Sequence, residues 1–291
     1  MLIPQILKKG DKIGIVAPAR KISHDEIKNA VDYITSWGYE VVFGDSLFAD
    51  SNQYAGTDDD RANDFQKMLN NNEIKAILCA RGGYGSLRII DMLDFSNYQI
   101  NPKWIIGYSD ITVFHLTSNL KYNIASLHAT MPINFPDINN PNNAVNDLKS
   151  ILQGEPISYK SSNNSYNKKG TMWGPVVGGN LSVLYSLQGS FDINLLKDKV
   201  LFIEDLDEYL YHIDRMIISM KRAGWFKEIN GLIVGGMTDM RDNTIPFGKN
   251  PCEIITEALA EYNFPICFDF PSGHIEENIP IILGKKILLK V

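Results

Sequence analysis

The strongest constraint on the fold of this chain is the alternation of strand and helix signals through its first half. Four short apolar runs predict buried strands: residues 12–17, 39–43, 74–80 and 103–107. Between the first two runs, Ser23 and Glu26 form a capping box that predicts a helix start. Between the next two, Thr57 and three acidic residues predict a second helix start. Strand–helix–strand alternation with right-handed crossovers produces a parallel sheet covered on both faces, so we predict an α/β domain.

The second half of the chain changes character twice. Asn, Pro, Ser and Lys dominate residues 137–169, which predicts a linker with little structure of its own. We therefore expect an N-terminal domain over residues 1–136 and a C-terminal domain over residues 170–291. The signals expected in the latter are a glycine-rich turn at 178–180, strands at 200–203, 232–234 and 286–291, and helices at 209–223 and 253–262.

Composition narrows the class of protein. The 291 residues are 44% hydrophobic and 21% charged, which is typical of a folded chain. A net charge of −6 without a basic cluster argues against a nucleic-acid partner. No signal peptide and no apolar run of about 20 residues is present, so we expect no membrane segment. Three cysteines without metal-ligand spacing suggest free thiols, a cytoplasmic location and no metal.

The turn Gly107-Tyr108-Ser109-Asp110-Ile111 follows one of the predicted strands and precedes a predicted helix. A serine at such a turn is the position of a nucleophile in many hydrolases, although the usual last glycine is Ile111 here. The alternative is that Ser109 or Asp110 only caps the following helix. The residues of the turn leave both interpretations open.

A serine nucleophile needs a histidine base and a carboxylate that orients this base. Of five histidines, His274 lies in a loop between two strand-like segments, where functional residues are common. The run Leu201-Phe202-Ile203-Glu204-Asp205 is an apolar strand that ends in acids, and Glu204 lies closest to the sheet. Asp205 is the competing choice for the orienting acid. A cysteine nucleophile at Cys79 is a remoter alternative, because this residue lies within an apolar strand.

The loop Arg81-Gly82-Gly83-Tyr84-Gly85 follows the third predicted strand. Its glycines could cradle a phosphate, supply an oxyanion-binding N–H, or simply form a tight turn. The spacing matches neither common nucleotide-binding motif, so we expect no nucleotide cofactor. Arg81 could bind the carboxylate of a substrate, but an arginine at a turn also commonly forms a surface ion pair.

These motifs together resemble the LD-carboxypeptidases of serine peptidase family S66, a family that includes muramoyltetrapeptide carboxypeptidases and microcin C immunity proteins. The resemblance runs in order from residue 10 to about 286. The segments that carry it are residues 10–19, 81–85, 107–112, 178–181, 202–205, 213–216 and 273–274.

The resemblance implies a flavodoxin-like N-terminal α/β domain, a smaller β-rich C-terminal domain and an active site between them. It implies Ser109 as nucleophile, His274 as base and Glu204 as orienting acid. The oxyanion would be bound by backbone N–H groups of Asp110 and of the loop at Gly82 and Gly83.

The resemblance further implies that the substrate is a murein tetrapeptide that loses its terminal D-alanine, and that the chain forms a homodimer. Two alternatives stay open. One is a microcin-immunity-like hydrolase of peptidyl or aminoacyl adenylates, and the other is a ligand-binding protein without catalytic activity.

Overall fold

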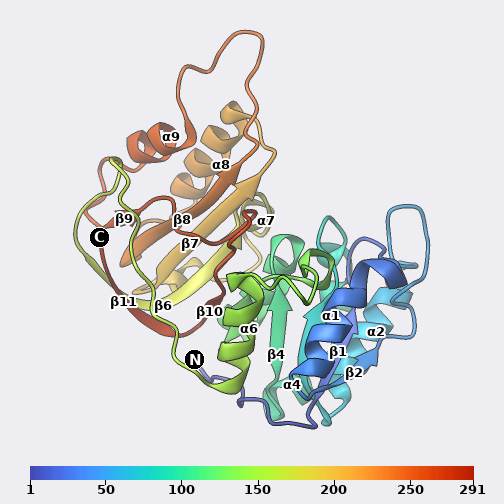
Figure 1. Ribbon diagram of the computed structural model, residues 1–291. Coiled ribbons are helices and arrows are strands. Elements are labelled where there is room, and N and C mark those ends of the chain that lie inside the picture. The colour runs from blue at the N-terminus through green and yellow to red at the C-terminus, as the bar shows by residue number, and fades with distance from the viewer. The chain divides into compact units, whose positions relative to one another are not determined.

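The computed structural model describes residues 1–291, and the chain divides into two compact units. Unit 1 comprises Met1–Ile157 and Ile279–Ile282, and unit 2 comprises Ser158–Asn278 and Leu283–Val291. Each unit is built on a sheet of its own with helices packed against it (Figure 1). The predicted α/β fold with two domains is therefore confirmed.

Unit 1 contains a six-stranded sheet in the order β10-β5-β4-β3-β1-β2. The pairs β1–β2, β1–β3, β3–β4 and β4–β5 are parallel, as the alternation of strands and helices predicts. The strands are β1 (Lys12–Val16), β2 (Glu40–Phe43), β3 (Ile74–Cys79), β4 (Trp104–Gly107), β5 (Ser126–His128) and β10 (Ile281–Leu283).

Helices cover both faces of this sheet. Alternation along β3 shows the two faces, because Ala76 and Leu78 belong to one apolar cluster and Ile77 and Cys79 to another. The first cluster packs under α1 (His24–Ser36) and α6 (Asn143–Gln153), in front of the sheet in Figure 1. The second packs under α2 (Asp58–Asn70), α4 (Ser96–Ile100) and α5 (Thr112–Leu116). Shorter helical segments are α3 (Ser86–Ile89), η1 (Ile90–Met92), η2 (Ser109–Ile111), η3 (Thr117–Lys121) and η4 (Pro132–Asn134).

The predicted linker over residues 137–169 is wrong in its central part, because residues 143–153 form α6. The Asn142 side chain caps this helix by accepting a hydrogen bond from the Val145 N–H at 3.1 Å. The helix ends at Gly154, whose φ is +86°. Its apolar face is buried in unit 1, and the asparagines around it conceal the i, i+3, i+7 pattern of Val145, Leu148 and Leu152.

The domain boundaries also differ from the prediction. The units divide between Ile157 and Ser158, and residues 158–169 belong to unit 2 rather than to a linker. There Lys168 and Ile266 exchange two backbone hydrogen bonds of 3.0 and 3.1 Å. Residues 279–282, predicted in the C-terminal domain, belong to unit 1, where β10 pairs at the β5 edge of the sheet. An added strand satisfies edge N–H and C=O groups, which local sequence signals cannot reveal.

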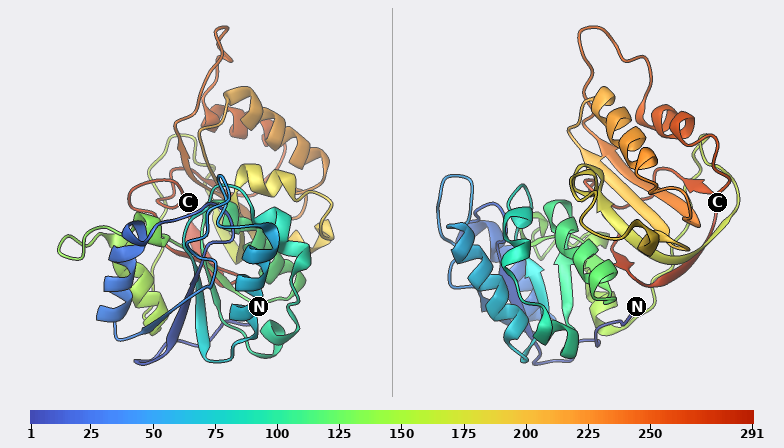
Figure 2. Two further views of the ribbon diagram at one scale, coloured as in Figure 1. Left: turned by 90° about the vertical axis from the view of Figure 1, so that its right-hand side faces the viewer. Right: turned by 180° about the vertical axis from the view of Figure 1, so that it is seen from behind.

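Unit 2 contains a five-stranded sheet in the order β11-β6-β7-β8-β9, with only β11 antiparallel to its neighbour. The strands are β6 (Thr171–Asn180), β7 (Val200–Leu206), β8 (Gly231–Thr238), β9 (Ile266–Cys267) and β11 (Lys286–Lys290). Helix α8 (Leu210–Arg222) buries Ile213, Met216 and Met220 and contacts both α7 (Leu181–Ser186) and α9 (Pro251–Ala258) (Figure 2). A short 3₁₀ segment is η5 (Ile193–Leu196). The helices make unit 2 a mixed α/β structure around the expected sheet.

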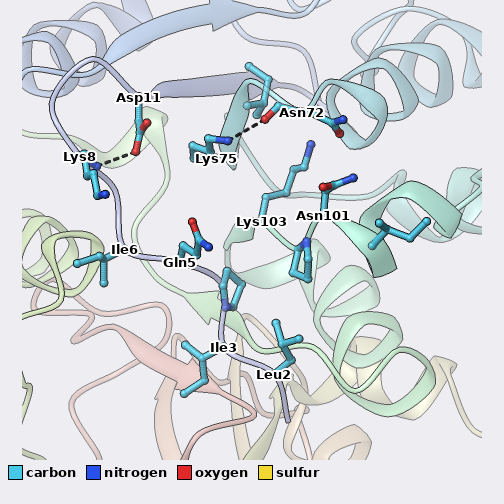
Figure 3. Close-up of a pocket in the computed structure, with 14 residues that line it drawn as sticks. Leu2, Ile3, Gln5, Ile6, Lys8, Asp11, Asn72, Lys75, Asn101 and Lys103 are labelled. Atoms are coloured by element: carbon cyan, nitrogen blue, oxygen red, sulfur yellow. Dashed lines mark hydrogen bonds between the residues drawn. The ribbon is translucent and has the colours of Figure 1, made fainter.

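A cavity of about 530 Å³ lies in unit 1 where β1, β3 and β4 begin (Figure 3). The Ser109 turn follows the opposite end of β4. Lys103, which is 1% exposed, lies beside the cavity. Its ammonium donates hydrogen bonds of 2.7–3.1 Å to the carbonyls of Met68, Leu69 and Asn71, at the end of α2. Burial lowers the pKa of Lys103 to about 8. Lys103 therefore caps α2 and has a structural role.

None of the helices is both long and apolar enough to cross a lipid bilayer.

Candidate active site

Ser109 lies at the sharp turn that follows β4 and is the first residue of η2, which leads into α5. Its φ is +64°, a left-handed conformation that costs a non-glycine residue about 1–2 kcal/mol. The turn also needs Gly107, where φ is +156° and a Cβ atom would lie 2.8 Å from the Ile111 side chain. Neither η2 nor α5 has a side-chain cap hydrogen bond, so the capping alternative for Ser109 is not what the structure shows. A strained, partly exposed serine at a strand–helix turn is the geometry of a nucleophile elbow.

Gly82 of the glycine loop lies directly against Ser109. A Cβ atom at Gly82 would be 2.9 Å from Ser109 Cβ, 3.1 Å from Ser109 Oγ and 3.5 Å from the Asp110 amide nitrogen. The backbone of the loop at Gly82 therefore lies next to the Ser109 hydroxyl and to the Asp110 N–H. This arrangement favours an oxyanion-binding role for the loop over a phosphate cradle.

We expect Gly82→Ala to reduce turnover by about 10- to 1,000-fold, because the added methyl group displaces Ser109 or the donors around it. The loss should be in kcat. The same displacement should also lower the stability of the loop at Gly82, so turnover is measured at a temperature where the variant is folded. Gly10→Ala is the matched control: φ is +86° there and no atom lies within 4 Å of the added Cβ. It should lower stability and leave kcat unchanged. Equal kcat in wild type and Gly82→Ala would contradict the role of the loop.

Asp110 contributes more than the backbone N–H that the sequence indicates. Its side chain is 3% exposed and accepts a hydrogen bond from the Ser86 N–H at 2.8 Å. Burial raises the pKa of its carboxyl. The carboxylate thus joins the serine turn to the end of the glycine loop. No local sequence pattern predicts this contact, because Ser86 and Asp110 belong to different strand–helix connections.

Arg81 forms the ion pair that was the alternative to a substrate-binding role. Its guanidinium lies 3.3 Å from Glu26 Oε1, and both side chains are about one-third exposed. The other Glu26 oxygen, Oε2, accepts from Ser23 and completes the predicted capping box. Arg81 and Glu26 line a cavity of about 410 Å³ at the start of α1. A substrate carboxylate at Arg81 would have to compete with Glu26, so this role stays a prediction.

In unit 2, Glu204 and His274 form a buried pair. Glu204 is fully buried at the end of β7, and its Oε2 accepts from the His274 N–H at 3.1 Å and from Nδ1 at 2.6 Å. Because a carboxylate only accepts, Nδ1 carries the proton and Nε2 is the basic nitrogen. Burial lowers the pKa of His274, but the Glu204 hydrogen bond and charge raise it more, so the net shift is upward from 6.5. The pair is the arrangement of a general base and its orienting acid.

Asp205, the competing acid, is directed elsewhere. Its carboxylate accepts from Asn180 Nδ2, the Ser182 N–H and the Leu206 N–H, each at 2.9 Å. Burial and the neighbouring Glu204 raise its pKa to about 7. β7 is an interior strand whose residues 200–205 are all buried, so the two consecutive acids are both buried as well. Glu204 is therefore the carboxylate bonded to His274.

Gly273 allows His274 to approach Glu204. Its φ is +116°, and a Cβ atom there would lie 2.8 Å from both Cβ and Oε2 of Glu204. Any side chain at this position would push the histidine loop away from the end of β7. The Gly273-His274 motif thus has a direct steric explanation.

His115 is a structural residue that the sequence does not single out. It is fully buried; Nε2 lies 2.9 Å from the Gly107 carbonyl oxygen and Nδ1 lies 2.9 Å from Ser126 Oγ. A carbonyl only accepts, so Nε2 donates to the Gly107 carbonyl. This hydrogen bond holds the end of β4 in place, just before Ser109. Burial lowers the pKa of His115 to about 4. Cys79 is also fully buried with a raised pKa, which argues against a thiolate nucleophile.

We expect His115 to make folding sensitive to acid. The unfolded chain binds this proton near pH 6.5 and the folded chain near pH 4, so stability falls as pH drops through this window, by about 3 kcal/mol. His115→Gln cannot bind the proton. The difference in unfolding free energy between wild type and variant, measured in urea from pH 7 to pH 4, should shrink toward low pH. A difference that is constant with pH would contradict this assignment.

A serine elbow on one α/β unit and a buried carboxylate–histidine pair on another are features of serine hydrolases. The chain belongs to the LD-carboxypeptidase family, peptidase family S66. The sequence models of the N-terminal and C-terminal domains of this family match residues 13–129 and 173–289.

Named relatives cover nearly the whole chain. A probable murein peptide carboxypeptidase of Bacillus subtilis is 32% identical over 97% of this chain and 90% of its own length. Two solved structures share the fold. They are a muramoyltetrapeptide carboxypeptidase from Oxalobacter formigenes (TM-score 0.82, 23% identity, 96% and 95% of the two chains) and the microcin C7 self-immunity protein MccF (TM-score 0.86, 21%, 100% and 96%).

Proposed function

We propose that this protein is a serine LD-carboxypeptidase that releases the terminal D-alanine from murein tetrapeptides. Ser109 would be the nucleophile, His274 the base and Glu204 the acid that orients it. The observation that carries the proposal is the buried bond between His274 Nδ1 and Glu204 Oε2, because it leaves Nε2 as a base with a raised pKa. The names of the relatives support the substrate class.

In this mechanism His274 Nε2 takes the proton of Ser109 Oγ while Oγ attacks the carbonyl carbon of the bond to D-alanine. Backbone N–H groups of Asp110 and of the loop at Gly82 and Gly83 hold the oxyanion. The imidazolium then gives its proton to the leaving amine, and D-alanine departs. His274 next deprotonates a water molecule, which attacks the acyl-enzyme and restores Ser109.

A second candidate is hydrolysis of peptidyl or aminoacyl adenylates. It is favoured by a relative named a microcin C7 self-immunity protein, 24% identical over 98% of this chain. Rates of D-alanine release and of adenylate hydrolysis, measured with the same preparation, distinguish the two activities. A kcat/KM at least tenfold higher for the tetrapeptide supports the proposal, and the reverse ratio supports the alternative.

A ligand-binding protein without catalysis is distinguished by a covalent probe. A fluorophosphonate should label Ser109 of the proposed enzyme, and an acyl-enzyme should be trapped on rapid acid quenching with substrate. Tight binding of the tetrapeptide without either product would favour the binding protein.

The proposed activity also suggests where and in what form the protein works. Muropeptide trimming during wall recycling fits a cytoplasmic location, and the family resemblance suggests a homodimer. Sedimentation equilibrium of the full chain tests the dimer, and cell fractionation tests the location.

A further inference from the structure

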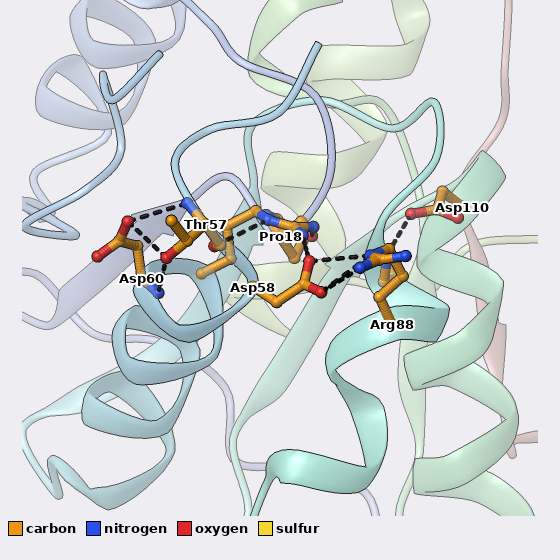
Figure 4. Close-up of polar contacts among 8 residues, drawn as sticks. Pro18, Thr57, Asp58, Asp60, Arg88 and Asp110 are labelled. Atoms are coloured by element: carbon orange, nitrogen blue, oxygen red, sulfur yellow. Dashed lines mark hydrogen bonds and ion pairs between the residues drawn. The ribbon is translucent and has the colours of Figure 1, made fainter. Parts of the chain in front are cut away.

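Arg61 is a fully buried arginine close to the serine turn. It belongs to the first turn of α2 and is 1% exposed, although arginine is almost never fully buried unless it is paired. Figure 4 shows the polar contacts of Thr57 and Asp60 at the start of α2, the pairing of Asp58 with Arg88, and the contact of Asp110. No part of the proposed mechanism uses the Arg61 side chain.

Each guanidinium nitrogen of Arg61 already has a hydrogen-bond partner within the protein. Nε donates to the Thr57 carbonyl at 3.3 Å, Nη1 donates to the Pro18 carbonyl at 2.8 Å, and Nη2 pairs with the Asp58 carboxylate. The Tyr54 ring covers one face of the guanidinium at 4.6 Å. The planar fork therefore ties α2 to the segment that follows β1, a task that a lysine could not perform.

The glycine loop rests on this guanidinium. Gly85 has a φ of +155°, and a Cβ atom there would lie 2.3 Å from Arg61 Nη1, 2.8 Å from Ala19 Cα and 3.1 Å from the Pro18 oxygen. No side chain fits between the loop and Arg61. Gly85 is thus in close contact with both Arg61 and the backbone that Arg61 holds.

The other end of the loop is fixed to the serine turn. The Ser86 N–H donates to Asp110 at 2.8 Å, and Gly82 lies against Ser109. The Gly82 carbonyl accepts a long hydrogen bond, 3.4 Å, from the Arg20 N–H. The loop of residues 82–86 therefore contacts Arg61 through Gly85 and is hydrogen-bonded to Asp110 through Ser86.

Charge gives Arg61 a second effect on this turn. Asp110 is a buried acid beside the place where the oxyanion would form, and burial disfavours its charged form. The positive charge of Arg61 acts in the opposite direction and favours the carboxylate. A charged Asp110 is the stronger acceptor for the Ser86 N–H.

We propose that Arg61 is a positioning residue: through Pro18, Gly85 and Asp110 it holds the glycine loop in the geometry that binds the oxyanion at Ser109. The proposal rests on the proposed serine chemistry but not on the identity of the peptide substrate.

The test compares Arg61→Ala with Lys103→Met. Both remove a buried cation that holds one end of α2, but Lys103 lies where the strands of unit 1 begin and touches no part of the serine turn. We expect both variants to lose stability in urea unfolding. Only Arg61→Ala should lose activity, about 10- to 100-fold in kcat with KM within about threefold. The rate at which a fluorophosphonate labels Ser109 should fall by a similar factor.

Guanidinium at a millimolar, non-denaturing concentration should restore part of the rate of Arg61→Ala, because it can occupy the vacated site. It should not change Lys103→Met. If Arg61→Ala does not fold, Asp58→Asn serves instead. It removes the carboxylate that pairs with Arg61, and because the same carboxylate accepts hydrogen bonds of 2.6–3.0 Å from Arg88, Arg88→Gln is measured beside it. A three- to tenfold loss is expected for Asp58→Asn and no loss for Arg88→Gln.

A kcat loss in Lys103→Met as large as in Arg61→Ala, or no loss in the folded variants of Arg61 and Asp58, would overturn the proposal. Failure of the proposed function has a different signature. Wild type would then be labelled at Ser109 but release no D-alanine, and the effect of Arg61→Ala on labelling would still test the inference.

Discussion

Ser109→Ala is expected to abolish D-alanine release from a murein tetrapeptide, lowering kcat by about 10⁴- to 10⁶-fold. Alanine cannot form the acyl-enzyme, whereas the rest of the turn is unchanged. Ser109 already has a φ of +64°, and alanine meets the same strain there, so the unfolding free energy should stay within about 0.5 kcal/mol. The measurement is D-alanine release, followed by a coupled oxidase assay and checked by mass spectrometry.

Ser36→Ala, at the end of α1, is the matched control for loss of a serine hydroxyl and should retain full activity. Circular dichroism should be the same for all three proteins, and only Ser109→Ala should lose fluorophosphonate labelling. Turnover by purified Ser109→Ala above the level of an empty-vector preparation would identify a different nucleophile.

Glu204→Gln is expected to lower kcat by about 10²- to 10⁴-fold and to move the acidic limb of the pH profile. Activity needs neutral His274, whose pKa in the wild type lies above 6.5 because Glu204 outweighs burial. Without the charge of Glu204 burial dominates, so the pKa falls below its ordinary value. The limb of kcat/KM should therefore inflect above pH 6.5 in the wild type and at lower pH in the variant.

The same substitution should also destabilise unit 2. Glu204 Oε1 is buried without a hydrogen-bond partner, and Oε2 takes both His274 donors. The amide oxygen of glutamine must replace Oε2, which leaves its NH₂ group at the Oε1 position without an acceptor, at a cost of about 1–3 kcal/mol. Asp205→Asn is the control. Asp205→Asn removes a charge that also raises the pKa of His274, but the Asp205 side chain is hydrogen-bonded elsewhere. The shift of the acidic limb should therefore be smaller in Asp205→Asn than in Glu204→Gln. A larger shift for Asp205→Asn would contradict Glu204 as the orienting acid.

Much of the fold could be predicted because its signals are local. Strands of unit 1 show as apolar runs, and the Ser23–Glu26 capping box marks the start of α1 within three residues. Asparagines around the apolar positions of α6 hide this helix from the sequence pattern, and the place of residues 279–282 cannot be predicted because pairing at a sheet edge depends on a distant strand. Neither difference affects the α/β class of the chain.

The candidate site, like the fold, has parts that local sequence signals predict and parts that they do not. Motif spacing and the family resemblance were enough to name Ser109, Glu204 and His274. They could not show why Glu204 rather than Asp205 bonds to the histidine, since both acids are buried in β7 and only the hydrogen bonds of the folded chain separate them. They also gave no sign of Arg61, which on an acidic helix start looks like an ordinary surface ion pair.

The α/β class, the order of most elements and the residue types of a serine hydrolase can thus be predicted from local sequence signals. These follow from periodicity, capping and short motifs, which depend on neighbours a few residues apart. Four features are visible only in the folded chain: the left-handed conformation of Ser109, the contact of Gly82 with its hydroxyl, the pairing of His274 with Glu204 and the burial of Arg61 under the glycine loop. Local signals cannot predict them, because each feature depends on contacts between residues distant along the chain or on a strained conformation that such contacts maintain.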